Sequence, residues 1–197
     1  MKKQEQTYIS FRNAVLIIGL SVICFAIQMA SAAPFAMAPM ILAFVSSPLS
    51  VIISGAIFVL IMNKAPYRGT MFLFILLFSI PMLFMGTPYV VLMFLLGGVL
   101  GELVFWKDST RTPKKISIAY AIFAVCLGLG TYLPAMIQKD SLLSGITAQN
   151  YAQATIDAYD KLYSLPYISM AIALTVVASF IGVFIGCKIF KKHFAKI

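Results

Sequence analysis

Charge is scarce in this chain, and most of it has one sign. Only 11% of the 197 residues are charged, with 15 lysines and arginines against 6 aspartates and glutamates, whereas soluble domains carry about 25% charged residues. Hydrophobic residues make up 61% of the chain, more than a soluble core of this size can bury. The composition excludes an ordinary soluble domain. It predicts an all-α, polytopic membrane protein that uses residues 1–197 as one integral membrane domain.

Catalytic and metal-binding residues are equally sparse. His193 is the only histidine, and Cys24, Cys126 and Cys187 lie in or at the end of apolar runs without a C-x-x-C pair. The chain lacks H-E-x-x-H, G-x-S-x-G and the phosphate-binding G-x-x-x-x-G-K-[ST]. We therefore expect no metal site, no cofactor and no enzymatic activity. Any ATP hydrolysis would belong to partner proteins. Because the basic residues form short clusters between apolar runs, nucleic acid is not an expected partner.

Six apolar stretches predict six transmembrane helices. They cover about residues 13–33, 34–62, 70–85, 89–106, 116–137 and 166–187. The second stretch should break near Pro48, because proline removes a backbone donor. Two short crossings in its place are the alternative. The first stretch could instead be a signal peptide cleaved near Ala30 to Ala33, although it is long for one.

The lysines and arginines orient this bundle, since they accumulate on cytoplasmic loops. Six spans leave only Lys139 and Lys161 on the outer side, which predicts cytoplasmic N and C termini in a bacterial cell membrane. Splitting the second span would move Lys64 and Arg68 outside, so the charges favour one crossing. The inner side receives Lys2, Lys3, Arg12, Lys64, Arg68, Lys107, Arg111, Lys114, Lys115, Lys188, Lys191, Lys192 and Lys196.

The outer loop at 138–165 contains a predicted amphipathic helix from Tyr151 onward. Ala152, Ile156, Tyr159 and Tyr163 recur at helical spacing, with polar residues on the other faces. Such a helix could cover a cavity, or it could be a solvated connector resting on the bundle.

Small residues mark places where helices approach closely. Gly97-Gly98-x-x-Gly101 and Gly182-x-x-x-Gly186 favour packing inside the bundle over a partner contact. The first span offers the candidate face for a partner subunit. Its residues are Ala14, Ile18, Ser21, Ala26 and Ala30.

Glu102 is the only carboxylate within a predicted span, and an ionisable group there is expensive to desolvate. It lies near the inner end of its span, where Lys107 could be close. We therefore expect an anchor or an ion pair in preference to a proton relay.

Tyrosine and methionine gather toward the outer halves of the predicted spans. Tyrosines at this depth usually form an interfacial belt, and methionines usually fill the core. Around a pocket, the same side chains would suit a flat, largely apolar ligand. The candidate substrate-binding residues are Gln28, Met37, Met85, Tyr89, Tyr163 and Tyr167.

Three stretches together resemble the S components of energy-coupling factor (ECF) transporters, in particular the integral membrane family labelled Trep-Strep. The ending is similar to that family's Lys-Lys-His-Phe-Lys-Lys-Ala-Gly-Ile, although here the last residues are Ala195-Lys196-Ile197. The stretches are Met62-Asn63-Lys64-Ala65-Pro66-Tyr67-Arg68-Gly69, then Gly86-Thr87-Pro88-Tyr89 with Gly97-Gly98-x-x-Gly101-Glu102-Leu103, and finally Gly182-x-x-x-Gly186-x-Lys188-x-x-Lys191-Lys192-His193-Phe194-x-Lys196-Ile197.

This resemblance implies a six-helix subunit that captures a micronutrient or cofactor-like solute from outside. It also implies partners, namely a transmembrane T subunit, which usually contacts an Ala-x-x-x-Ala face of the first helix, and two ATPase subunits. A tetrapyrrole such as haem would suit a pocket of methionine and tyrosine, because thioether and phenolate can ligate iron. The alternative function is a non-transporting membrane adaptor or assembly protein.

Overall fold

The computed structural model describes residues 10–35, 38–85, 87–106, 110–149 and 151–193, and within these ranges it is helical without strands. Met37, Lys107 and the last four residues lie outside them. The helices are α1 (Phe11–Ala32), α2 (Pro39–Ile41), α3 (Ser47–Lys64), α4 (Thr70–Phe84), α5 (Pro88–Leu103), α6 (Pro113–Ile137), α7 (Lys139–Ala148), α8 (Gln153–Leu162) and α9 (Leu165–His193), with a 3-10 turn at Ala33–Phe35 and a π-helical turn at Leu42–Ser46.

Four helical runs of the described chain are long and apolar enough to cross a membrane. They are Phe11–Phe35, Pro39–Lys64, α6 and α9. The other two apolar helices, α4 and α5, have 15 and 16 residues, which is roughly 23 Å of helix. All six apolar stretches are thus helices, but length and composition qualify only four of them as spans.

The predicted break at Pro48 takes the form of a π-helical turn. Leu42–Ser46 is π-helical and leads directly into α3, with Pro48 in the first turn of that helix. The N–H of Ser47 bonds to the carbonyl oxygen of Leu42, five residues back, so the i→i−4 pattern is already interrupted beside the proline, which has no N–H. Residues 39–64 therefore form one continuous helical run in place of two short ones.

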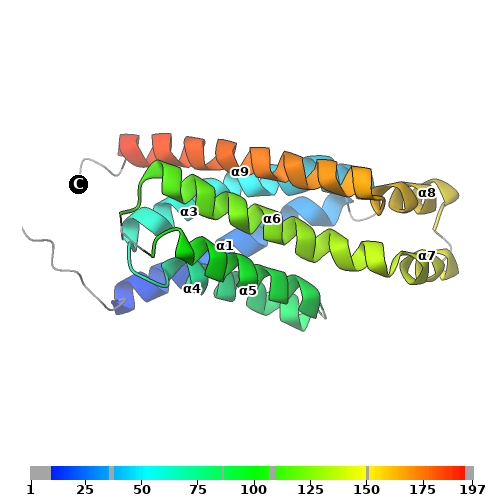
Figure 1. Cartoon of the computed structure of the whole chain (residues 1–197), viewed down its shortest axis with the longest axis horizontal. Coiled ribbons are helices and arrows are strands. Elements are labelled where there is room, and N and C mark those ends of the chain that lie inside the picture. The colour runs from blue at the N-terminus through cyan, green and yellow to red at the C-terminus, as the bar shows by residue number, and fades with distance from the viewer. Residues whose placement is uncertain (1–9, 36–37, 86, 107–109, 150, 194–197) are drawn as a thin grey trace, which may run out of the picture.

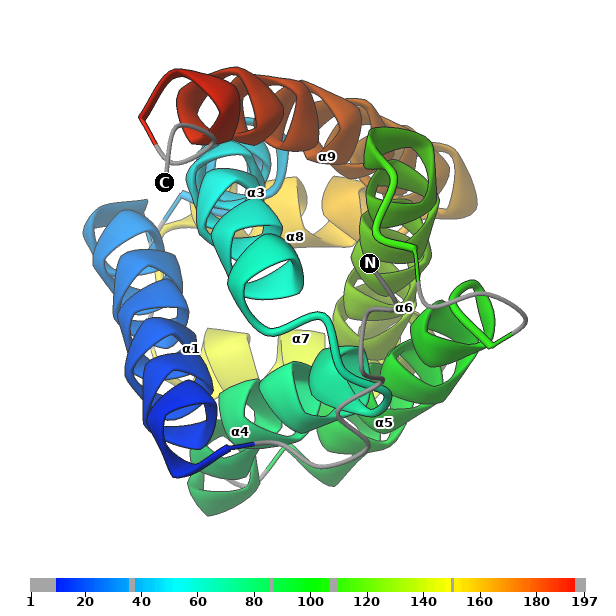
Figure 2. The same cartoon turned by 90° about the vertical axis from the view of Figure 1, so that its left-hand side faces the viewer.

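Six helices form a closed ring, which Figure 2 shows from one end. Around the ring, α1 contacts α4, and α5, α6, α9 and α3 follow in turn before α3 returns to α1. Aromatic side chains fill the space between the six helices. Phe58 stacks on Tyr120 with centroids 4.8 Å apart, and Phe78 contacts Phe94 and Phe123 at 5.6 and 5.9 Å.

Glycine permits the close approach of α3 and α9. A Cβ atom on Gly182 would lie 2.6 Å from the carbonyl oxygen of Ile52, and one on Gly186 would lie 2.8 Å from the Cα of Ala56. The α5 glycines also face inward, since a Cβ on Gly97 would meet Cys126 at 2.9 Å. Both glycine motifs therefore serve packing inside the bundle, as their spacing predicted.

The two ends of the bundle are built differently (Figure 1). The start of α1, the α3–α4 and α5–α6 connections and the end of α9 gather at one end, and α7 and α8 cover the other. We call these the cationic end and the lid end. The cationic end takes its name from Arg12, Lys64, Lys114, Lys115, Lys188, Lys191 and Lys192, which lie at the ends of these helices.

The largest differences from the predicted elements are at α9 and α7. α9 continues to His193, six residues past the predicted end at Cys187, because lysines are good helix formers and favour the negative end of the helix dipole. α7 precedes the single helix predicted for the loop. Its apolar residues Leu142, Leu143 and Ile146 have helical spacing, but no residue of α7 is buried.

Candidate functional site

A cavity of about 310 Å³ lies inside the ring, in the half covered by α8. Phe78 and Phe94 close it on the side of the aromatic cluster, and Met82, Val90 and Leu127 supply apolar wall. The helices α1, α3, α4, α5, α6, α8 and α9 all contribute residues, together with the irregular segment at 39–46. The cavity is thus assembled from nearly every element of the described chain.

Helix α8 covers the cavity through its apolar face. Tyr159, Leu162 and Tyr163 all line the cavity, and Leu162 is only 3% exposed. The rings of Tyr159 and Tyr163 pack with centroids 5.7 Å apart. The structure therefore favours the lid over the solvated connector, the other interpretation of this loop.

The phenols of the lid are neutral groups at ordinary pH. Burial raises the pKa of Tyr163 to about 12, and the neighbouring phenols of Tyr159 and Tyr132 act in the same direction. Burial also raises the pKa of Tyr159 above its usual value. At the outer rim of the lid, Lys139 Nζ lies 2.8 Å from Asp160 Oδ1, an ion pair that ties the start of α7 to α8.

Gln28 is the one amide side chain in the described lining. The hydroxyl of Ser50 lies 2.7 Å from its Oε1 atom, so one end of the amide is held by α3. The same side chain lines the cavity. An amide fixed in this way can orient a ligand at a single polar point.

The predicted substrate-binding residues do not all meet in this cavity. Gln28 and Tyr163 line it, whereas Tyr89 is 57% exposed and lines a separate pocket of about 180 Å³ between α5 and α6. Met85 is 58% exposed and lines neither pocket. Tyr167 also lies outside both, with its ring 6.4 Å from that of Phe44. Met37 lies outside the described residues.

Sequence reasoning missed most of the polar lining. Thr87, Thr131, Tyr132 and Thr175 line the cavity but were not among the candidate substrate-binding residues. Threonine in a membrane helix can hydrogen-bond to its own helix, so its presence does not reveal which way it faces. Their position along the predicted spans could have identified them, because all four lie in the half of the bundle predicted to be outer.

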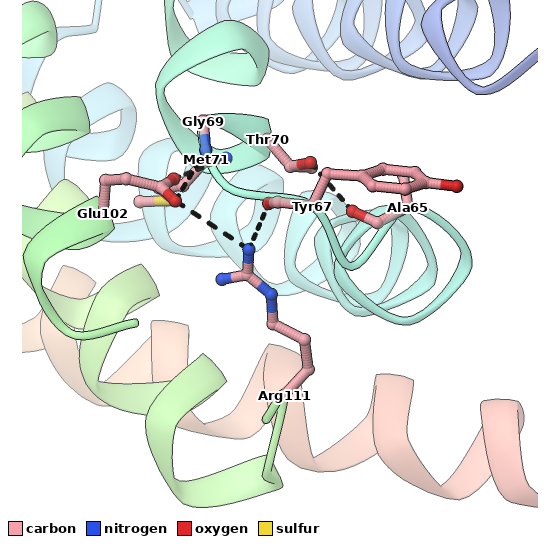
Figure 3. A network of polar contacts seen from close by, with 7 residues as sticks. All are labelled: Ala65, Tyr67, Gly69, Thr70, Met71, Glu102 and Arg111. Atoms are coloured by element: carbon pink, nitrogen blue, oxygen red, sulfur yellow. Dashed lines mark hydrogen bonds and ion pairs between the residues drawn. The ribbon is translucent and has the colours of Figure 1, made fainter. Parts of the chain in front are cut away.

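The cationic end contains a second polar site, centred on Glu102 (Figure 3). Its Oε1 accepts a hydrogen bond from the N–H of Gly69 at 2.7 Å, and its Oε2 accepts one from the N–H of Met71 at 3.1 Å. The carboxylate thus caps the first turn of α4, where the helix dipole favours negative charge. Gly69 enters this turn with φ +84°, a conformation that side chains other than glycine resist.

Arg111 completes this polar site. Its Nη2 lies 3.8 Å from Glu102 Oε1 and donates to the carbonyl oxygen of Tyr67, and its guanidinium carbon is 3.8 Å from the ring centroid of Phe105. Burial lowers the pKa of Arg111, and Glu102 partly offsets that effect. The ion pair expected for Glu102 is present, with Arg111 as its described partner.

The residues of the predicted partner face do not all lie on the same side of α1. Ile18, Ala26 and Ala30 are exposed, and Ala14 is partly exposed. Ser21 is fully buried and donates a hydrogen bond to the carbonyl oxygen of Ile17 at 2.7 Å. Ser21 therefore faces the interior, and the outward face consists of the other four residues.

A ring of apolar helices around a covered cavity is typical of an integral membrane protein with an internal site at one end. Comparison with family models also indicates an integral membrane protein. The chain belongs to the Trep_Strep family, described as hypothetical bacterial integral membrane proteins, whose model matches residues 11–196. No curated protein and no solved structure matches it.

Proposed function

We propose that this chain is the S component of an ECF-type uptake transporter, which captures a micronutrient or cofactor-like solute outside the cell. The covered cavity carries this proposal. A solute-capturing membrane subunit needs a largely apolar site that can be covered, and α8 lies over this one with its polar side outward. The cationic opposite end suits a cytoplasmic face.

The proposal includes six crossings with both termini in the cytoplasm. The short helices α4 and α5 then cross as a hairpin, with a helix length of roughly 23 Å against a hydrocarbon core of about 30 Å. Locally thinned bilayer accommodates such a mismatch at modest cost. The cationic end then faces the cytoplasm of a bacterial cell, and the cavity opens outward.

Energy for uptake comes from partner proteins in this proposal, a T subunit and two ATPase subunits. The outward face of α1 is the proposed contact with the T subunit, because Ala26 and Ala30 are small, exposed and one helical turn apart. Ser21 is omitted from this contact because it is buried.

Haem is not the solute that this cavity favours. Met82, Tyr132, Tyr159 and Tyr163 could ligate iron. The described lining nevertheless offers no cation for the carboxylates of a tetrapyrrole, and an unpaired buried carboxylate is costly.

Affinity purification of the tagged full chain from its bacterial host, in a gentle detergent, tests the proposed assembly. We expect the T subunit and both ATPase subunits to be recovered with it. Recovery of another protein by an empty bundle would instead support the adaptor function.

A pair of substitutions tests the proposed contact face. Ala26→Trp should reduce recovery of the T subunit. Val177→Trp is the matched control, since Val177 is 54% exposed on α9, away from α1. Equal recovery with both variants would exclude this face of α1.

A further inference from the structure

The cavity offers hydrogen bonds without offering charge. Its described lining contains no lysine, arginine, aspartate, glutamate or histidine. Of the lid's cations, Lys139 is paired with Asp160 at 2.8 Å, and Lys161 is exposed and lies outside the lining. An anionic group placed in this cavity would lose its hydration without gaining a counter-charge.

Three threonines in the lining present acceptors. The hydroxyl of Thr131 donates to the carbonyl oxygen of Leu127, and that of Thr175 donates to the carbonyl oxygen of Ala171, each at 2.8 Å. Thr87 does the same at the α4–α5 turn, where its hydroxyl donates to the carbonyl oxygen of Met82 at 2.8 Å. With its hydrogen committed, each of these hydroxyls can offer a ligand only its oxygen lone pairs.

Aromatic and apolar groups surround these acceptors. Phe78 and Phe94 form one side of the cavity, and Tyr132 and Tyr163 lie on its lining toward the lid. Ring faces favour flat, polarisable ligands by stacking and by apolar burial.

We infer that the cavity takes an uncharged aromatic or heteroaromatic solute whose N–H or O–H groups donate to Thr131 and Thr175, with Gln28 pairing its remaining polar edge. The inference rests on the proposed function, because it specifies the solute of the same site. It excludes carboxylated and phosphorylated solutes, tetrapyrroles with free carboxylates included.

Native mass spectrometry of the full chain, purified from its bacterial host and reconstituted in lipid nanodiscs, tests this inference. One small molecule per chain should be retained. After release by denaturation, its mass and its electrophoretic mobility at pH 7 should identify an uncharged compound with at least one N–H or O–H group.

Matched variants test the acceptor role. Thr131→Val and Thr175→Val keep the side-chain volume and remove the acceptor, and each should reduce retention about 3- to 10-fold, the range for one neutral hydrogen bond. Thr175→Ser keeps the hydroxyl and should restore most of the retention. Thr147→Val is the control, because Thr147 donates to the carbonyl oxygen of Leu143 in the same way but is exposed on α7.

The outcomes separate this inference from the proposed function. A released molecule that carries a carboxylate or a phosphate overturns the inference and leaves solute capture intact. Retention by Thr131→Val and Thr175→Val equal to that of Thr147→Val also overturns it, because the acceptors would then have no role. A folded wild-type chain that holds no small molecule overturns the proposed function, and the inference with it.

Discussion

The two ends of the bundle are held by different kinds of contact. At the cationic end, Glu102 and Arg111 join the α3–α4 and α5–α6 connections through hydrogen bonds and an ion pair. At the lid end, α8 rests on the ring mainly through the buried side chain of Leu162 and its aromatic neighbours. Directional contacts between buried charged groups resist displacement, whereas a single short amphipathic helix can open locally. The molecule thus combines an end held by directional polar contacts with an end held mainly by apolar packing.

The largest expected effect concerns the close packing of α3 against α9, which supports the whole bundle. Gly182→Leu should destabilise the whole ring, because its Cβ would lie 2.6 Å from the backbone oxygen of Ile52 and the backbone cannot yield cheaply. We expect a loss of about 3 kcal/mol or more in the free energy of unfolding. Thermal unfolding in detergent measures it. Gly19→Leu is the control, since a Cβ on Gly19 meets nothing within 4 Å, and an equal loss there would contradict this account.

Removal of the carboxylate at the cationic end should have the next largest effect. Glu102→Ala leaves the N–H groups of Gly69 and Met71 without their acceptor and leaves Arg111 buried without its counter-charge, which together cost about 3 kcal/mol. Asp157→Ala is the control, because that carboxylate accepts only an exposed hydrogen bond from Gln153. The double variant Glu102→Ala with Arg111→Met should recover part of the loss. If it does not, the buried charge is not the cause.

A substitution in the lid should loosen that end alone. Leu162→Ala removes the buried anchor of α8 and should cost about 2 to 3 kcal/mol against local opening, within the range for a buried leucine. Hydrogen exchange should rise in α8 and stay unchanged in α4. Faster exchange in both helices would show that the two ends are not independent.

The ion pair at the rim of the lid should contribute less. Asp160→Asn breaks the contact with Lys139, in which the aspartate side chain is 55% exposed. Pairs of this kind contribute about 0.2 to 1 kcal/mol, and salt screens them. Exchange in α8 should rise slightly at low ionic strength, and the difference from wild type should vanish in 1 M salt. A difference that persists at high salt would require another explanation.

The smallest effect is expected from pH. Because burial raises the pKa of Tyr163 to about 12 and raises that of Tyr159, both phenols stay protonated from pH 6 to pH 9. Their contribution to the folded lid is lost only as the pH rises above the ordinary tyrosine value of about 10. Retention of the bound small molecule should therefore be constant between pH 6 and pH 9. A decrease within that range would place a titrating group in the site.

The sequence did not predict which residues of each helix face the cavity, because it does not give the rotation of a helix about its own axis. Gln28 and Tyr163 were selected by depth and line the cavity, but Tyr89 and Met85 were selected by the same criterion and are exposed. Depth follows from position along a span. The direction of a side chain follows from packing, and a span that is apolar on every side gives no periodic signal of which face is buried.

The sequence by itself determined that this chain is a helical membrane protein, because its long apolar stretches can satisfy their backbone groups in lipid only as helices. It also predicted the inward glycine faces and an ion pair at Glu102. Only the tertiary structure decided that Ser21 faces inward while Ala26 and Ala30 face outward, and that Arg111 partners Glu102. It also decided that threonines from two helices and the α4–α5 turn line one cavity. Those features depend on how the helices are rotated and which of them are neighbours, and both are set by contacts between residues far apart in the chain.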